Sequence, residues 1–198
     1  MVQRQTAAVP QRMLSVIIAT LDSEAPLVAT LTALVPGAME GLVSEVIVAD
    51  GGSRDGTATV ADVAGCHFAV IEGPLGRRLK TAAATARAPW LLFLRPGTIP
   101  DAAWTGEVRR FVERPPPGAP AAVFRRGGAA QPALKEILSL LAAALGALPR
   151  AEQGLLIAHP LYDELGGHSD ADADPETDLV RRIGRRRIAT LATGATSR

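Results

Sequence analysis

The chain has 198 residues, and its 21 basic and 20 acidic side chains leave a formal net charge of +1. This length suits one α/β domain, and the balanced charge gives no sign of a nucleic-acid partner. The single cysteine, Cys66, excludes an intramolecular disulfide framework and a cysteine-rich zinc site. The polar first residues lack the apolar core of a signal peptide, and the most apolar stretch, 134–148, is shorter than the roughly 20 residues of a membrane span. We therefore expect a cytoplasmic protein with no transmembrane segment.

The first half of the chain alternates strand-like and helix-like segments. Short apolar runs rich in β-branched residues predict buried strands, and apolar residues at helical spacing predict the helices between them. Three βα units with short links predict an α/β fold, with a mostly parallel sheet and helices on both faces. The predicted strands are 14–20, 45–50, 67–71 and 90–94, and the predicted helices are 24–34, 57–64 and 77–87.

The pattern changes after Pro100. Asp101 is a candidate N-cap for a helix that ends at the proline run 115–117. We expect a flexible N-terminus at 1–13, a single domain at 14–190 and a tail at 191–198. The further predicted elements are a short strand at 121–124, an apolar helix at 132–148, a strand at 154–158, a turn or short helix at 161–165 and a basic helix at 175–187.

Polar side chains follow three of the predicted strands. They are found in Thr20-Leu-Asp-Ser-Glu24, in Asp50-Gly-Gly-Ser53 and in Arg95-Pro-Gly-Thr98. Ligands of open parallel sheets bind at these carboxyl ends. A carboxylate followed by glycines can accept hydrogen bonds from a nucleobase or ribose while the backbone approaches closely. Two plainer interpretations stay open, namely that Asp50 only caps a turn and that Thr20 only ends a strand.

Several common nucleotide and hydrolase motifs are absent from the sequence. No GxxxxGK[ST] segment is present, which excludes a P-loop, and no GxGxxG follows the first predicted strand, which disfavours a dinucleotide-dependent dehydrogenase. The lack of a GxSxG segment disfavours an α/β-hydrolase.

In their order and spacing, three segments resemble the family 2 glycosyltransferases with a GT-A (Rossmann-like) fold. They are Ser15-Val-Ile-Ile-Ala-Thr-Leu-Asp-Ser-Glu24, Glu45-Val-Ile-Val-Ala-Asp-Gly-Gly-Ser-Arg-Asp-Gly-Thr57 and Trp90-Leu-Leu-Phe-Leu94. The Asp-Gly-Gly-Ser form and the later Gly76-Arg77 look most like a small bacterial subgroup associated with radical-SAM and selenium-domain proteins. Segments at 152–157, 162–167 and 176–183 extend the resemblance over about 14–190.

The resemblance implies that a UDP- or GDP-sugar binds over residues 14–100 and that residues 101–190 form the acceptor half. Seven residues match the nucleotide-sugar site. Thr20, Asp22 and Glu24 would frame the nucleotide, and Asp50 and Gly51 would contact the base or ribose. Arg77 and Arg78 would lie near the diphosphate. Arginine forks suit phosphate oxygens. A solvated helix start is the alternative interpretation of the two arginines.

The Asp-x-Asp motif, which in this family usually holds Mg²⁺ or Mn²⁺ on the diphosphate, is degenerate here. Arg95-Pro-Gly-Thr98 stands in its place and offers no carboxylate to a hard divalent cation. We therefore expect no metal ligands at this position. Either Arg95 supplies the positive charge and transfer is independent of metal, or the protein is a lapsed enzyme that only binds nucleotide sugars.

An inverting transfer needs a carboxylate that takes the proton of the acceptor hydroxyl. Glu176 best matches the family's base position, and Asp178 is the second candidate. Both acids can instead simply complement the dipole of the helix that begins there. The cluster 181–187 is either a solvated helix face or a surface that attracts anionic lipid headgroups. The latter would suit a lipid-linked acceptor and peripheral contact with the inner face of the membrane.

Overall fold

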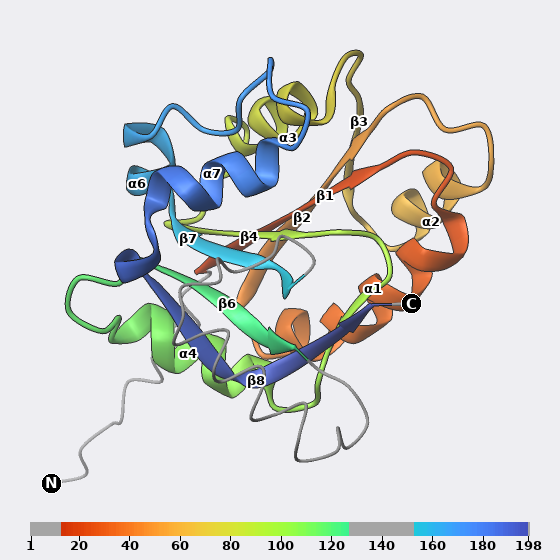
Figure 1. Cartoon of the computed structure of the whole chain (residues 1–198). Coiled ribbons are helices and arrows are strands. Elements are labelled where there is room, and N and C mark those ends of the chain that lie inside the picture. Colours follow the sequence, from red (N-terminus) through yellow and green to blue (C-terminus); the bar gives the residue numbers. More distant parts are fainter. Residues whose placement is uncertain (1–12, 127–152, 198) are drawn as a thin grey trace, which may run out of the picture.

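The computed structural model describes residues 13–126 and 153–197, and one mixed sheet of eight strands lies at the centre of this part of the chain (Figure 1). The strands follow the spatial order β3-β2-β1-β4-β7-β6-β8-β5. In chain order they are β1 (Leu14–Thr20), β2 (Val43–Asp50), β3 (His67–Val70), β4 (Trp90–Leu94), β5 (Thr98–Pro100), β6 (Ala121–Arg126), β7 (Leu155–Ala158) and β8 (Ile188–Ser197). The first four strands are parallel, and β7 runs antiparallel to both β4 and β6.

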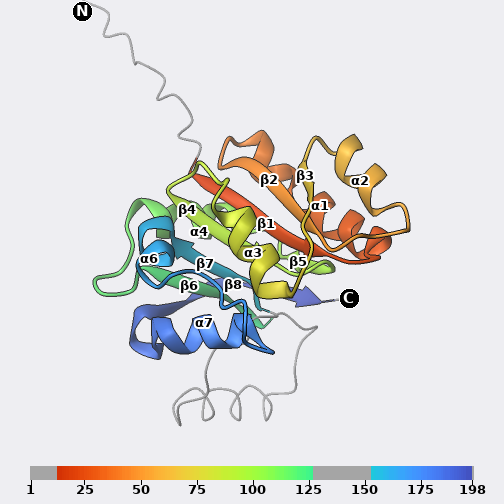
Figure 2. The ribbon, with the colours of Figure 1, turned by 90° about the horizontal axis from the view of Figure 1, so that it is seen from above.

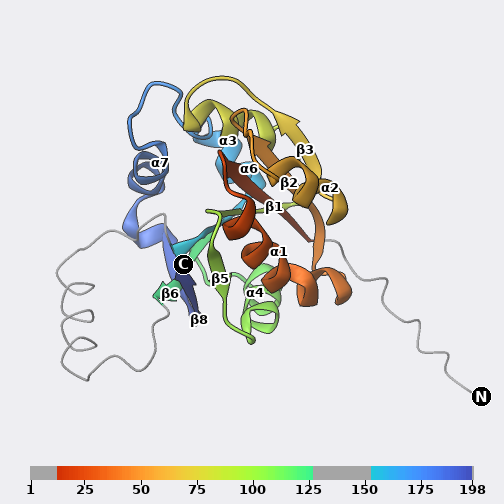
Figure 3. The same ribbon diagram turned by 90° about the vertical axis from the view of Figure 1, so that its right-hand side faces the viewer.

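Helices cover both faces of the sheet (Figure 3). One apolar cluster joins the sheet to α1, α2 and α4, and a second joins its other face to α3, α6 and α7. Figure 2 shows α3 lying over the parallel strands, where it contacts β1 and β2. The helices are α1 (Glu24–Met39), α2 (Thr57–Val63), α3 (Leu75–Ala83), α4 (Trp104–Glu113), α6 (His159–Glu164) and α7 (Pro175–Ile183), followed by the 3₁₀ turn η2 (Arg185–Arg187).

The central strands are buried on both faces, as their apolar runs predict. Val16, Ile17 and Ile18 of β1 are fully buried, and every residue of β4 is buried. Strands with two covered faces need apolar side chains at consecutive positions, which explains why these segments do not alternate. The predicted α/β class, with a largely parallel sheet between helices, is confirmed.

The tail expected from residue 191 is wrong for the described residues up to 197, because these residues belong to β8. This strand lies between β6 and β5, where Leu191 and Ala195 are buried. Asp101, the expected N-cap of α4, lies three residues before the helix; its Oδ1 accepts from the N–H of Ala103 at 3.0 Å, and its carboxylate also binds β8. Its carboxylate accepts hydrogen bonds from the N–H of Gly194 and the hydroxyl of Thr193, and α4 begins only at Trp104.

Helix ends also differ from the prediction, and α3, predicted at 77–87, spans Leu75–Ala83. The basic helix ends at Ile183 because Gly184 has a φ of 83°, a left-handed value that favours glycine and interrupts the helix. In the other direction, α1 continues through Pro36 to Met39. The expected flexible N-terminus, apart from Met13, and the expected apolar helix at 132–148 lie outside the described residues. Among the described helices, none has the length and apolar character needed to cross a membrane.

Candidate functional site

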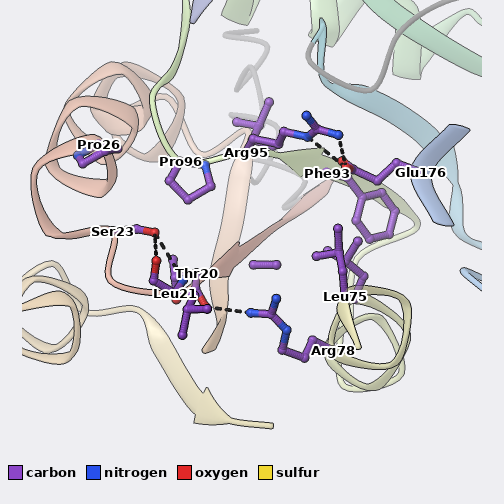
Figure 4. Close-up of a pocket in the computed structure, with 13 residues that line it drawn as sticks. Thr20, Leu21, Ser23, Pro26, Leu75, Arg78, Phe93, Arg95, Pro96 and Glu176 are labelled. Atoms are coloured by element: carbon purple, nitrogen blue, oxygen red, sulfur yellow. Dashed lines mark hydrogen bonds and ion pairs between the residues drawn. The ribbon is translucent and has the colours of Figure 1, made fainter. Parts of the chain in front are cut away.

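A cleft of about 340 Å³ opens at the carboxyl ends of β1 and β4 (Figure 4). The start of α1 and the loop after β4 form one side, and α3 and the first turn of α7 form the other. Four of the ten predicted site residues line it, and they come from four different parts of the chain. They are Thr20, Arg78, Arg95 and Glu176.

Arg95 and Glu176 form an ion pair in the wall of this cleft. Nε and Nη2 of Arg95 both donate to the same carboxylate oxygen, Oε2 of Glu176, at 2.8 and 2.5 Å. The side chain of Arg95 is 42% exposed, whereas that of Glu176 is 11% exposed. The predicted base and the predicted substitute for the metal are therefore in direct contact, with the guanidinium on the more accessible side.

Arg78 lies across the end of β1. Its Nη1 donates to the carbonyl oxygen of Thr20 at 2.7 Å, and its buried Nε has no hydrogen-bond partner within the described part of the chain. A Cβ atom at Gly51 would lie 2.7 Å from Nη1 of Arg78. This nitrogen is the far end of a flexible side chain, so a side chain at residue 51 would require Arg78 to shift.

Asp50 lies beside Thr20, as its register partner on β2, and is only 1% exposed. Its Oδ1 accepts hydrogen bonds from the hydroxyls of Thr20 and Ser53, and its Oδ2 accepts from the N–H groups of Gly52 and Ser53. Burial alone would raise the pKa of Asp50, but these hydrogen bonds outweigh burial and lower it. Both oxygens are fully used by the turn, so this geometry matches the turn-capping alternative, and contact with a base or ribose stays a prediction.

Asp22 and Glu24 connect the loop after β1 to the loop after β2. Oδ1 of Asp22 accepts from the N–H of Arg54 at 2.8 Å, and Oε2 of Glu24 accepts from the N–H of Gly56 at 3.0 Å. Asp22 has a φ of 46°, a conformation that aspartate tolerates better than most residues. Neither carboxylate lines the cleft. Both support the loops that form its edge.

Arg77 and Asp178 do not line the cleft. Nε of Arg77 lies 3.4 Å from Oδ2 of Asp170, and this pair is exposed. Asp178 accepts a hydrogen bond of 2.7 Å from Nε of Arg182, whose other nitrogens donate to the carbonyl oxygens of Leu165 and Gly167. Asp178, the second base candidate, therefore orients Arg182, which links α7 to the loop after α6. The structure does not bring Asp178 to the predicted site.

Apolar residues that the sequence reasoning missed complete the cleft wall. Leu75 lies at the start of α3, and Phe93 comes from β4. Phe93 packs on Tyr162 and against the edge of His168, with ring centroids 5.2 and 4.7 Å away. Burial, reinforced by the positive charge of Arg182, lowers the pKa of His168 to about 3. A buried strand gives no sequence signal of which end faces a ligand, so only the strand-end rule could have pointed to Phe93.

The described residues contain no cluster of three His, Cys, Asp or Glu side chains able to hold a metal ion. The one carboxylate that lines the cleft, that of Glu176, is bound by Arg95. Hard divalent cations need several oxygen ligands, and Gly97 has no side chain to offer. The residues present at this cleft therefore do not fit the Mg²⁺ or Mn²⁺ site usual for the resembled family.

The arrangement of the sheet, its covering helices and the strand-end cleft is that of a GT-A-like α/β protein. Solved structures of glucosyl-3-phosphoglycerate synthase from Mycobacterium tuberculosis share this fold. The complex with phosphoglyceric acid aligns with a TM-score of 0.66 and 21% identity over 90% of this chain and 69% of that one. The complex with Mn²⁺ and UDP-glucose aligns with a TM-score of 0.66 and 22% identity over 90% and 68%.

The sequence itself matches the model of glycosyl transferase family 2 over residues 15–133. The chain belongs to this family. Comparison with curated protein sequences gives no match.

Proposed function

We propose that the protein transfers a sugar from a UDP- or GDP-sugar to an acceptor hydroxyl, with inversion and without a divalent metal. One observation supports this most directly. The cleft contains two guanidinium groups, of Arg78 and Arg95, together with one carboxylate, of Glu176. These are the charges that an inverting transfer needs for its leaving diphosphate and its acceptor proton.

In the proposed reaction the acceptor oxygen attacks the anomeric carbon of the sugar. The bond from that carbon to the phosphate oxygen breaks, and the nucleoside diphosphate leaves with the electron pair. Arg95 and Arg78 stabilise the developing negative charge. Glu176 takes the acceptor proton, while Thr20 and the loop that Asp22 and Glu24 support frame the nucleotide.

Independence of metal follows from the same residues. The Mycobacterium tuberculosis synthase has been solved with Mn²⁺ and UDP-glucose, which supports a UDP-sugar as the first donor to test. In this chain, however, Arg95 stands where the metal-binding motif is usual. The guanidinium supplies a permanent positive charge at the diphosphate.

A second candidate function is binding of nucleotide sugars without turnover. The Arg95–Glu176 pair favours it, because the oxygen that would take the proton already accepts two hydrogen bonds from the guanidinium. If the pair does not open, the protein retains a ligand site but has no base.

Turnover of UDP- and GDP-sugars by the purified protein, in excess chelator and then in manganese, tests both candidates. We expect hydrolysis or transfer that survives chelation and that falls strongly in Glu176→Gln. Activity that appears only with manganese would contradict independence of metal. Binding without turnover, unchanged by Glu176→Gln, would establish the second candidate instead.

The acceptor class and the division of the domain are further parts of the proposal. Residues 14–100 bind the donor and residues 101–190 bind the acceptor, and Glu176 reaches the cleft from the second half. Exposed arginines at 181, 185 and 186 favour a lipid-linked acceptor at the inner face of the membrane. We also assign the chain to the small bacterial subgroup associated with radical-SAM and selenium-domain proteins, on Asp50-Gly-Gly-Ser53 and Gly76-Arg77.

A further inference from the structure

We infer that Glu176 binds Arg95 before the donor arrives, and that the diphosphate of the donor then takes the place of Glu176 as the partner of Arg95. Donor binding therefore frees Glu176 to act as the base. This inference rests on the proposed function and adds to it the order in which the donor binds and the base becomes available. The same arginine first occupies the carboxylate and then neutralises the leaving group. The acceptor proton therefore has a place to go only after the donor is bound.

The geometry of the pair makes such an exchange possible. Both guanidinium nitrogens converge on one oxygen, Oε2, at 2.8 and 2.5 Å, and Oε1 of Glu176 accepts no hydrogen bond from the described residues. This contact to a single oxygen lacks the two parallel bonds of a fork-to-fork pair, which is the stronger arrangement. A phosphate group offers the guanidinium two oxygens at once, so Arg95 gains a bidentate partner when it changes from Glu176 to the diphosphate.

The two partners are held differently. Glu176 lies in the first turn of α7, which Pro175 begins and which the side chain of Asp174 caps by accepting from the N–H of Thr177. Its side chain is 11% exposed, whereas the longer side chain of Arg95 is 42% exposed. The carboxylate is thus fixed to a helix in the wall, and the guanidinium is the group with access to an incoming ligand.

The charges in the cleft favour the exchange. Arg78 and Arg95 are positive and Glu176 is negative, so the lining residues leave one positive charge for a ligand with at least two negative charges. Figure 4 shows Arg78 and Arg95 on opposite sides of the cleft. A diphosphate between them would be attracted by both guanidinium groups and repelled by the carboxylate. Neutralising Glu176 should therefore strengthen diphosphate binding even though it removes the proposed base.

The exchange precedes the chemical step. The donor enters with its diphosphate, Arg95 moves from Oε2 to phosphate oxygens, and Oε2 becomes an acceptor for the hydroxyl of the second substrate. The acceptor oxygen then forms its bond to the anomeric carbon as the bond to phosphate breaks. The proton goes to Oε2, and the electron pair goes to the departing diphosphate beside Arg95.

Calorimetric titration of the full-length protein with UDP and with GDP tests this exchange. We expect Glu176→Gln to bind the nucleoside diphosphate about fivefold more tightly than the wild type, because a partly exposed ion pair no longer has to open. Turnover in the same variant should fall at least about 100-fold, since the base is lost. A purely structural role would weaken binding and turnover together.

Glu107→Gln is the matched control, because it removes the same charge from an arginine pair on α4 that does not line the cleft. Its affinity should equal that of the wild type. Arg95→Gln should weaken binding about tenfold, and adding Glu176→Gln to that variant should raise affinity by clearly less than it does in the wild type, because only the repulsion by the carboxylate is then removed. This non-additivity is the signature of direct competition for one guanidinium.

The outcomes separate the exchange from the proposed function. Equal or weaker binding by Glu176→Gln, in a protein that does bind UDP or GDP, overturns the exchange and leaves the transfer proposal standing. If Glu176→Gln binds the nucleotide and the wild type binds it only weakly, the exchange is supported. If neither protein binds either nucleotide, the proposed function fails and the exchange fails with it.

Discussion

Replacing Asp50 by asparagine tests whether this carboxylate supports the loop or contacts the ligand. The carboxylate accepts four hydrogen bonds, two from hydroxyls and two from backbone N–H groups. Asparagine can keep its carbonyl oxygen toward the N–H groups and turn its amide toward the hydroxyls of Thr20 and Ser53, which can rotate to accept. Four charge-assisted bonds thus become neutral ones, and relaxation of the partly exposed turn recovers some of the loss. We expect a destabilisation of about 1–2 kcal/mol.

For a domain of this size, that loss lowers the melting temperature by about 2–8 °C. The hydrogen bonds keep the pKa of Asp50 below its ordinary 3.8, so its contribution is complete above that pH and is lost as pH falls through the lower folded value. Urea unfolding at pH 7 should therefore separate the variant from the wild type, and the difference should shrink below about pH 4. Asp62→Asn, on the exposed surface of α2, is the control. Unchanged stability with lost UDP binding would refute the loop-support reasoning.

Three further substitutions test the packing of the domain. Gly76→Ala would place a Cβ against the carbonyl oxygen of Ser169. We expect the free energy of unfolding, measured in urea, to fall by about 1–3 kcal/mol. Unchanged stability would contradict this close approach. Burial, with the charge of Arg182, keeps His168 neutral in the folded protein, so the stability of the wild type should fall by up to about 1.4 kcal/mol per pH unit as pH drops from 6.5 toward about 3. His168→Gln should remove this fall. An identical pH profile in the variant would contradict the reasoning. Trp104→Ala, at a fully buried ring, should cost about 3–5 kcal/mol in the same assay, and a loss below about 1 kcal/mol would show that the site collapses without a cavity.

The fold was predictable where burial requires a recognisable pattern of apolar residues. β1 and β4 are covered on both faces, so their residues are apolar without alternation and their limits were predicted closely. β8 was missed because Ala, Thr and Gly dominate Ile188–Ser197, and this composition does not distinguish a strand from a surface tail. Its state is decided by pairing with β6 and β5, which are distant in the chain. Local sequence has no information on such partners.

The candidate site was predictable by position more than by contact. The strand-end rule pointed to Thr20 and Arg95, but the pairing of Arg95 with Glu176 joins residues 81 positions apart. Helix geometry could have separated Glu176 from Asp178, since positions two apart on a helix point about 200° apart and cannot share a face. The same reasoning distinguishes Arg77 from Arg78, whose directions differ by about 100°.

The insertion of β8 between β6 and β5 has a consequence for synthesis. On the ribosome, β1 to β4 can pair as soon as they emerge, because each has a partner among these four strands. β5 pairs with β8, and Asp101 binds Thr193 and Gly194, so these groups must wait for a segment made much later. The nascent protein therefore passes through a stage in which half of its sheet is formed beside an unfinished edge, a period in which chaperones would be most useful to it.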